Sequence, residues 1–226
     1  MNKTIEYTNL LNPITKELKR FVKEGIDKNV YGIVVRPQCL NIVKKSLKNT
    51  DLKSITVAGF PPLHSIPLIK KNPKKYAWIL GSYNKRQRNE LHMILDEDPD
   101  ELDIIFPFYW YVKGHLLRCR DWITGIKKRV KFLKVIIELG TFIADHYSLF
   151  EITSILKDSG VDMVKTNSGI LSRDFKTLIA LLQEHRDTLL PFPIKASGGI
   201  RTKEQVEILL NLGVKRIGTS DISKIL

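Results

Sequence analysis

Two lysines in this sequence stand near the ends of short apolar segments, and each is followed by small or hydroxyl residues and then glycine. The segments are Val164-Lys165-Thr166-Asn167-Ser168-Gly169 and Ile194-Lys195-Ala196-Ser197-Gly198-Gly199. A lysine attacks a carbonyl only as the free amine, and burial together with a nearby cation lowers its pKa toward neutrality. One lysine would be the nucleophile of a Schiff-base reaction and the other its electrostatic helper. An isolated lysine at a strand end usually just extends into solvent, so the pairing carries this prediction.

An aspartate lies inside another apolar segment, Leu102-Asp103-Ile104-Ile105-Phe106. A buried carboxylate is costly unless it is paired or used in catalysis. If Asp103 points into an interior that contains lysines, it has partners and could act as a proton shuttle. The alternative is an aspartate exposed to water at the start of a strand. Lys134 is a similar inward-facing candidate on the segment from Leu133 to Leu139, with Glu138 as a secondary one.

Two stretches with glycine and hydroxyl residues resemble anion-binding turns, Ser197-Gly198-Gly199 and Gly218-Thr219-Ser220. Small residues let backbone N–H groups approach an anion closely, and the N-terminus of a helix adds a favourable dipole. The first stretch precedes a helix start at Thr202, which has capping-box spacing with Gln205. Either stretch alone is equally typical of a simple turn, but together in the last two loops they match the usual phosphate position in a barrel.

The elements that must position these residues alternate between short β-branched runs and longer amphipathic stretches, which is typical of a parallel sheet connected by helices. The fold class predicted is α/β, a single (β/α)8 TIM barrel. In such a barrel the C-terminal ends of consecutive strands lie side by side, which would bring Lys165 and Lys195 together. Strands are expected at residues 5–10, 31–36, 54–60, 102–106, 133–139, 162–166, 193–196 and 215–219. Helices are expected around residues 14–27, 38–48, 84–96, 114–129, 147–159, 173–186 and 202–212.

The longest connection follows the third expected strand and runs from Phe60 to Leu102. Its first half contains Pro61, Pro62, Pro67 and Pro73, several lysines, and the apolar patch Tyr76-Ala77-Trp78-Ile79-Leu80. We interpret it as an insertion, and loops of this length in compact domains are often functional. A lid, an oligomer contact and a longer surface loop all stay open as its role.

Bulk properties limit the class of protein. The 226 residues suit one domain, residues 1–226, with 43% hydrophobic and 27% charged residues. The formal charge of +13 is spread over most expected helices, which favours a solvated basic surface over a nucleic-acid-binding one. No apolar run is long enough for a signal peptide or a membrane span, so we expect a cytoplasmic protein with no membrane partner. Cys39 and Cys119 are expected to be reduced thiols.

Three segments resemble deoxyribose-phosphate aldolases in order and spacing. They are Val164 to Gly169, Ile194 to Thr202, and Arg216-Ile217-Gly218-Thr219-Ser220. The resemblance continues through Leu133 to Glu138, Glu101-Leu102-Asp103, Val57-Ala58-Gly59-Phe60-Pro61 and, weakly, Tyr7-Thr8-Asn9-Leu10. It therefore covers nearly the whole chain, and the segment around Lys195 is its most specific part.

This resemblance implies a class I aldolase, a lyase that reversibly cleaves 2-deoxyribose 5-phosphate to acetaldehyde and glyceraldehyde 3-phosphate without a metal or organic cofactor. It matches Lys165 to the Schiff-base lysine, Lys195 to the lysine that perturbs it, and Asp103 to the proton-relay aspartate. Lys134 matches a further lysine on the preceding strand. Substrate or phosphate contacts are expected from Ser168, Gly169, Gly198, Gly199, Gly218 and Ser220. The expected partner is a small phosphorylated sugar, and a homodimer stays open as the assembly.

Several residues depart from the family pattern. Asn167 and Ser168 replace the middle pair of the usual Thr-Ser-Thr-Gly, Asp221 stands where a second serine often completes the phosphate site, and Glu6 stands where an aspartate is common. The loop after Gly169 is shorter than usual, and Arg173 within it could supply a replacement anion contact. Two alternatives therefore remain, a related aldolase for a different aldehyde and a non-catalytic barrel that binds a phosphorylated metabolite.

Overall fold

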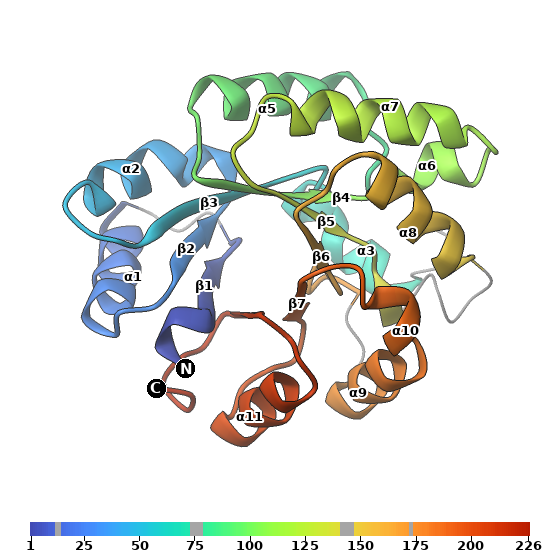
Figure 1. Ribbon diagram of the computed structural model, residues 1–226. Helices are drawn as coiled ribbons and strands as arrows, with labels where there is room; N and C mark the ends of the chain where they lie inside the picture. The colour runs from blue at the N-terminus through green and yellow to red at the C-terminus, as the bar shows by residue number, and fades with distance from the viewer. Residues whose placement is uncertain (12–14, 73–78, 141–146, 172–173) are drawn as a thin grey trace.

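The computed structural model shows a closed barrel of eight parallel strands, with helices around its outside (Figure 1). It describes residues 1–11, 15–72, 79–140, 147–171 and 174–226. Neighbouring strands pair in sequence order, and β1 pairs with β8 to close the barrel. The strands are β1 Ile5–Asn9, β2 Gly32–Val35, β3 Lys53–Ala58, β4 Glu101–Ile105, β5 Leu133–Ile136, β6 Met163–Lys165, β7 Ile194–Ser197 and β8 Arg216–Thr219. The predicted TIM barrel is confirmed.

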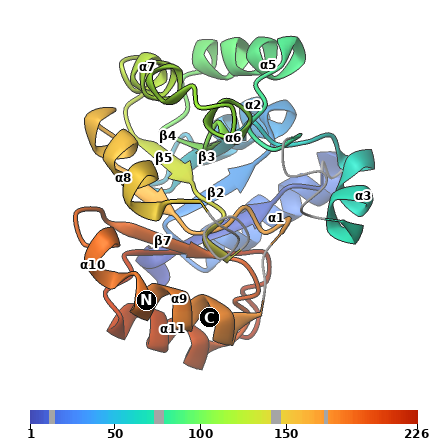
Figure 2. The same cartoon turned by 90° about the vertical axis from the view of Figure 1, so that its right-hand side faces the viewer.

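Helices cover the outer face of the barrel in both side views (Figures 1 and 2). The longer ones are α1 Thr15–Asp27, α2 Pro37–Leu47, α5 Lys85–Asp96, α7 Leu116–Lys127, α8 Leu149–Asp158, α9 Phe175–Glu184 and α11 Lys203–Asn211. Shorter ones are η1 Asn2–Thr4, η2 Leu63–Ser65, α3 Ile66–Lys71, α6 Phe108–Tyr111 and α10 Arg186–Leu189. None of these helices is long and apolar enough to cross a membrane.

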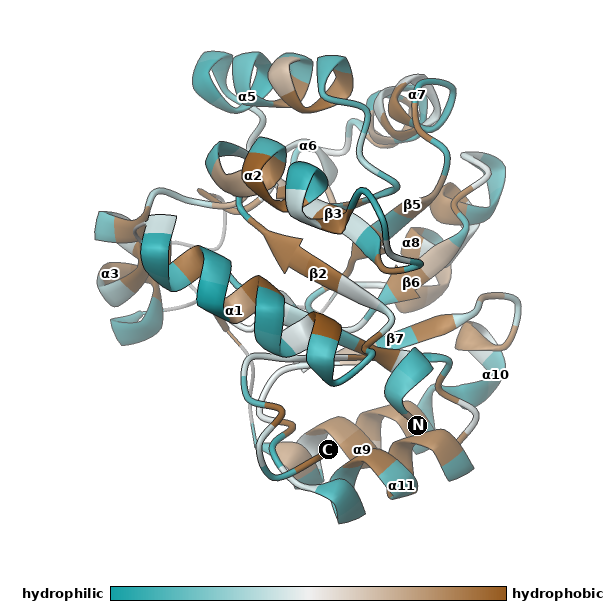
Figure 3. Ribbon diagram, turned by 90° about the vertical axis from the view of Figure 1, so that its left-hand side faces the viewer, coloured by the Kyte–Doolittle hydropathy of each residue, from teal (hydrophilic) through white to brown (hydrophobic). Residues whose placement is uncertain are grey.

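The helices form where the sequence supplies an apolar stripe and a cap. In α1 the buried residues Leu18, Phe21, Val22 and Gly25 follow helical spacing, and polar residues colour the face turned toward the viewer in Figure 3. The predicted capping box of α11 is present, because the Thr202 side chain accepts from the Gln205 N–H and the Gln205 side chain accepts from the Thr202 N–H. These local signals are why the expected helix positions agree with the structure.

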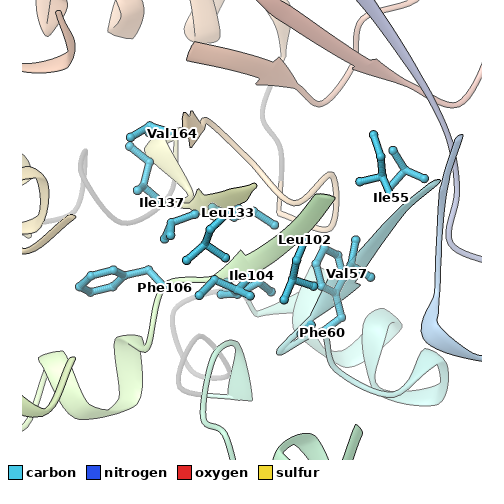
Figure 4. Packing of buried hydrophobic residues seen from close by; sticks show 14 of the residues in the cluster. Ile55, Val57, Phe60, Leu102, Ile104, Phe106, Leu133, Ile137 and Val164 are labelled. Carbon is cyan, nitrogen blue, oxygen red and sulfur yellow. The ribbon is translucent and has the colours of Figure 1, made fainter. Parts of the chain in front are cut away.

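Buried apolar residues of the strands and of the segments that follow them form one hydrophobic core. Figure 4 labels nine of its residues, Ile55, Val57, Phe60, Leu102, Ile104, Phe106, Leu133, Ile137 and Val164, which come from β3 to β6 and the residues that follow β3, β4 and β5. Along β4, β5 and β6 these residues alternate with Asp103, Lys134 and Lys165. Because side chains alternate across a strand, the polar residues face the barrel interior while the apolar ones face the helices.

The connection from β3 to β4 contains η2, α3 and α5, of which only α5 was expected. The sequence reasoning missed α3 because Pro67 reads as a helix breaker, but proline is tolerated in the first turn, where its missing N–H has no partner to lose. Tyr83 holds the connection against the barrel, since its buried hydroxyl donates to the Ile105 carbonyl at 2.6 Å. The patch residues Tyr76, Ala77 and Trp78 lie outside the described residues.

One strand boundary was wrong in a way that matters for the site. The sequence predicts a strand over residues 133–139, but β5 ends at Ile136. Glu138 has a φ of 48°, in the left-handed region that a β-strand does not contain. The segment still follows β6, because the N–H of Ile137 donates to the Lys165 carbonyl at 3.0 Å and that of Leu139 to the Thr166 carbonyl at 2.8 Å. The side chain of Glu138 therefore leaves the backbone next to the end of β6.

Candidate active site

The two predicted lysines lie side by side inside the barrel. Lys165 is the last residue of β6, and its Cα pairs with that of Lys195 on β7. Lys165 is 2% exposed and Lys195 is fully buried, so neither side chain extends into solvent. A buried ammonium group requires negative partners, and the barrel supplies them.

Asp103 is the centre of the cluster. Its Oδ2 lies 2.9 Å from Nζ of Lys165 and 2.7 Å from Nζ of Lys195, while Oδ1 lies 3.0 Å from Nζ of Lys134. The side chain is fully buried, so the structure places it in the interior and not at a wet strand start. Lys134, Lys165 and Lys195, all predicted from the sequence, thus contact the fourth predicted residue, Asp103.

Two further carboxylates belong to the cluster and were not among the predicted site residues. Glu6 on β1 contacts Nζ of Lys195 and lies 3.2 Å from Nζ of Lys134. Glu101 on β4 contacts Nζ of Lys134 and accepts from the Tyr31 hydroxyl. For Glu101 the signal was present in the sequence, because residues two apart on a strand face the same side and Asp103 was already a candidate for the interior.

Burial and charge set the ionisation of the cluster. Burial, opposed by Asp103 and assisted by the charge of Lys195, lowers the pKa of Lys165 to about 8. Burial by itself would raise the pKa of Asp103, but the charges of Lys134, Lys165 and Lys195 hold it well below its usual value. Burial by itself would lower the pKa of Lys134, but the charges of Asp103, Glu6 and Glu101 raise it above the ordinary range of lysine. Of Lys134 and Lys165, only Lys165 can therefore supply a free amine near neutral pH.

Buried side chains join the ends of β5, β6 and β7. The Asn167 Nδ2 group donates to the Ser197 carbonyl at 3.1 Å, and Oδ1 of the same amide accepts from the Gly140 N–H at 3.3 Å. Beside it, the Ser168 N–H donates to Oε1 of Glu138 at 2.9 Å. Asn167 departs from the family pattern, but its buried side chain is satisfied. The amide can both donate and accept, and it bonds one backbone carbonyl and one backbone N–H of the neighbouring strand ends.

The predicted anion-binding turns lie at the C-terminal mouth of the barrel. Gly169, Gly198 and Gly199 have φ values of 84°, 102° and 72°, a region that favours glycine. Gly169, Gly199 and Ser220 are exposed there. The Thr219 hydroxyl donates to the Ile200 carbonyl at 2.8 Å, which joins the end of β8 to the turn before α11.

Gly218 faces the lysine cluster. A Cβ atom at this position would lie 2.3 Å from Ser197 Oγ and 3.1 Å from Lys195 Cε. The glycine is therefore required by the close approach of β7 and β8 beside Lys195.

Gly218→Ala is expected to displace Lys195 and to destabilise the protein by about 1–3 kcal/mol, the usual cost of overpacking a core. Gly125→Ala on α7 is the matched control, because its Cβ would meet nothing within 4 Å and the change should be neutral or stabilising. Chemical denaturation and an aldol cleavage assay measure both effects. Wild-type stability and activity in Gly218→Ala would contradict the packing argument.

Asp221 follows the second anion-binding turn and is hydrogen-bonded within its own segment. Its Oδ1 accepts from the Ser223 N–H at 3.0 Å and from the Ser223 hydroxyl at 2.6 Å. These hydrogen bonds, assisted by Lys224 and Arg201, lower the pKa of Asp221. The carboxylate is therefore engaged by its own turn, and the exposed Arg201 supplies positive charge nearby. Arg173, the predicted replacement anion contact, lies outside the described residues.

Within the described ranges, no set of three or more His, Cys, Asp or Glu side chains is placed to bind a metal ion. Cys39 and Cys119 are buried free thiols.

A closed parallel barrel with buried lysines at adjacent strand ends, and a carboxylate between them, defines the class of lysine-dependent aldolases. The deoxyribose-phosphate aldolase of Mycoplasma pneumoniae is 32% identical over 203 residues, which cover 87% of this chain and 79% of that protein. That of Treponema denticola is 29% identical over 231 residues, covering 97% and 95%. The chain belongs to the deoxyribose-phosphate aldolase family. No protein-family model matches it.

Solved structures support the fold at lower identity. The deoxyribose phosphate aldolase of Aeropyrum pernix superposes with a TM-score of 0.73 at 22% identity, over 99% of this chain and 88% of that one. An N-acetylmannosamine-6-phosphate 2-epimerase from Clostridium perfringens also superposes, with a TM-score of 0.61 at 16% identity, covering 97% and 86%. Because an epimerase shares the barrel, the reaction must be argued from the site.

Proposed function

We propose that residues 1–226 form one class I aldolase domain that reversibly cleaves 2-deoxyribose 5-phosphate to acetaldehyde and glyceraldehyde 3-phosphate. The observation that carries the proposal is Lys165, a buried lysine with its pKa lowered to about 8, in contact with Asp103 and next to Lys195. The family membership supports the same reaction.

The proposed reaction begins with attack of the Lys165 amine on the aldehyde carbon of the open-chain sugar. Loss of water gives a protonated imine on Nζ. The bond between C2 and C3 of the sugar then breaks, and its electron pair moves into the imine to form an enamine. The C3 hydroxyl loses its proton in the same step, and its O–H electron pair forms the C=O bond of glyceraldehyde 3-phosphate. Protonation of the enamine and hydrolysis release acetaldehyde and return the free lysine.

The cluster around Lys165 has separate proposed roles. The charge of Lys195 opposes protonation of Lys165 and so favours the nucleophilic amine. Asp103, with Lys134 on its other oxygen, orients the lysines and serves as the proton relay. Since three lysines and the carboxylates of Glu6, Glu101 and Asp103 face one another, the interior balances its charge when all are ionised.

The phosphate would bind at the turns that contain Gly169, Gly198, Gly199, Gly218 and Ser220, with Ser168 beside them. Exposed glycines give an anion access to backbone N–H groups, and Arg201 adds a charge at the same mouth. Asp221, which stands where a second serine is usual, is hydrogen-bonded to Ser223 through Oδ1.

A panel of phosphorylated and free aldoses tests the substrate. We expect aldehyde release from 2-deoxyribose 5-phosphate with a Michaelis constant in the common micromolar to millimolar range, and much weaker release from 2-deoxyribose. Release from another phosphorylated aldose alone would favour the related aldolase with a different aldehyde. If no member is cleaved and acetaldehyde with borohydride leaves the lysines unmodified, the non-catalytic barrel is the correct reading.

A further inference from the structure

Glu138 is a buried carboxyl group at the mouth of the barrel that the mechanism above does not use. The backbone on both sides of it is hydrogen-bonded to the end of β6, through Ile137 N–H to the Lys165 carbonyl and Leu139 N–H to the Thr166 carbonyl. On β5 the Cα of Ile136 pairs with that of Lys165, so Glu138 lies beyond the nucleophile toward the mouth. Its left-handed φ of 48° is a strained conformation for a residue with a side chain, and such strain is concentrated at functional sites.

The two oxygens of the Glu138 carboxyl group differ in their hydrogen bonding. Oε1 accepts from the Ser168 N–H at 2.9 Å, which fixes the orientation of the group. Oε2 is buried and has no hydrogen-bond partner in the part of the chain that the structure describes. A buried carboxylate oxygen without a partner is unfavourable, so its retention calls for a partner that arrives with the substrate.

The position of Ser168 indicates which substrate atom that partner would be. Ser168 follows Lys165 by three residues and directly precedes Gly169 of the anion-binding turn. On the proposed function, the substrate is joined to Lys165 at one end and bound by its phosphate at this turn at the other. The hydroxyl-bearing carbon that becomes the new aldehyde lies between these ends, at the level where Glu138 is held.

We infer that Glu138 is a further catalytic residue of this reaction, whose Oε2 accepts the proton of the substrate hydroxyl as the carbon–carbon bond breaks. In this step the O–H bond breaks and its proton goes to Glu138. The O–H electron pair forms the new C=O bond, and the pair of the breaking C–C bond enters the imine to give the enamine. Glu138 returns the proton when the reaction runs in the direction of synthesis.

The charges around the two carboxyl groups agree with this division of work. Asp103 is held as an anion by three lysines, so its relay role is to pass protons among these lysines and not to retain the proton of the substrate hydroxyl. Burial raises the pKa of Glu138 to about 7, with Ser168 and the charge of Lys165 acting in the opposite direction. A group that titrates near neutrality is the more effective proton acceptor at neutral pH. Lys134, Lys195 and Asp103 lie deeper along the barrel than Lys165 or beside it, on β5, β7 and β4.

Glu138→Gln separates this role from a structural one, because the amide oxygen can still accept from the Ser168 N–H but cannot take a proton. Two reactions are compared in the full-length protein. Deuterium exchange into the methyl group of acetaldehyde in heavy water requires only the imine and the enamine, whereas cleavage of 2-deoxyribose 5-phosphate also requires removal of the hydroxyl proton. We expect exchange near the wild-type rate and cleavage reduced by roughly 100-fold or more, the scale of losing a general base.

The pH profile gives a second measurement. In the wild type kcat/KM should rise through about pH 7 and again toward pH 8, and Glu138→Gln should lose the first rise. Wild-type cleavage in the variant would overturn the inference, and so would an equal loss of exchange and cleavage. Glu207→Gln on the exposed face of α11 is the matched control. Failure of acetaldehyde and borohydride to label Lys165 in the wild type would instead refute the proposed function.

Discussion

Lys165→Ala is expected to abolish aldol cleavage, with a loss of about 10⁴-fold or more, because the variant has no amine at the position where the imine forms. Lys134 is held as a cation by Asp103, Glu6 and Glu101. Lys195 is held in contact with Glu6 and Asp103. The variant should also fail to exchange deuterium into acetaldehyde, since exchange needs the same imine.

The measurement that identifies the nucleophile is reductive trapping. Acetaldehyde with borohydride should add an ethyl group to Lys165 of the wild type, read by mass spectrometry after proteolysis, and should add none to the barrel interior of Lys165→Ala. Lys203→Ala removes an exposed lysine of α11 and serves as the control, with wild-type cleavage expected. An adduct found on a different lysine of the wild type would sink the assignment of Lys165.

Sequence patterns predicted the barrel and its lysine pair because both depend on local information. Short β-branched runs and capping residues such as Thr202 define strands and helix starts within a few positions. Strand order then follows from the closed barrel, so the ends of β6 and β7 had to be adjacent, and with them Lys165 and Lys195. Asp103 was a candidate for the interior because the expected strand 102–106 is otherwise apolar, and the structure decides between that position and an exposed one.

The same sequence patterns do not predict contacts between side chains that are far apart in the chain. The contact between Glu6 and Lys195 joins residues 189 positions apart, and nothing in the segment around Glu6 indicates that partner. Glu138 was placed within a continuous strand, whereas its left-handed φ turns it toward Ser168. In both cases the role of the side chain depends on which distant residues the closed barrel brings together. The sequence predicts the order of the strands but not these side-chain contacts.

At the phosphate end, the effect of Asp221 depends on the groups that its carboxylate contacts. Asp221 in a phosphate-binding turn predicts repulsion if its carboxylate faces the anion. Two residues further along, Ser223 offers both an N–H and a hydroxyl, and the carboxylate binds them. The short Asp221-to-Ser223 spacing is a known local motif for aspartate, so it could have been used to predict this orientation.

Lys195→Met is expected to reduce cleavage strongly and to shift its pH dependence upward. Removing the cation eliminates one influence that lowers the pKa of Lys165 and leaves Asp103 free to favour the charged ammonium. With its pKa at about 8, roughly one Lys165 side chain in ten is the free amine at pH 7. A return to the ordinary lysine value would lower that fraction by about 300-fold, and this is the upper limit of the loss because burial, the largest cause of the lowered pKa, remains in the variant.

The rate should recover as the pH rises, because a higher pKa moves the appearance of the free amine to higher pH. A pH profile unchanged in shape would contradict the electrostatic role of Lys195.

The stability of Lys195→Met must be measured alongside its activity, since loss of one partner of a buried ion pair costs about 3–5 kcal/mol. In Lys195→Met the carboxylate of Glu6 loses its contact with Lys195. Adding Glu6→Gln to Lys195→Met removes that buried charge, so the double variant should regain stability without regaining activity at pH 7. Equal stability of the two variants, measured by denaturant unfolding, would show that Glu6 does not depend on Lys195 for its burial.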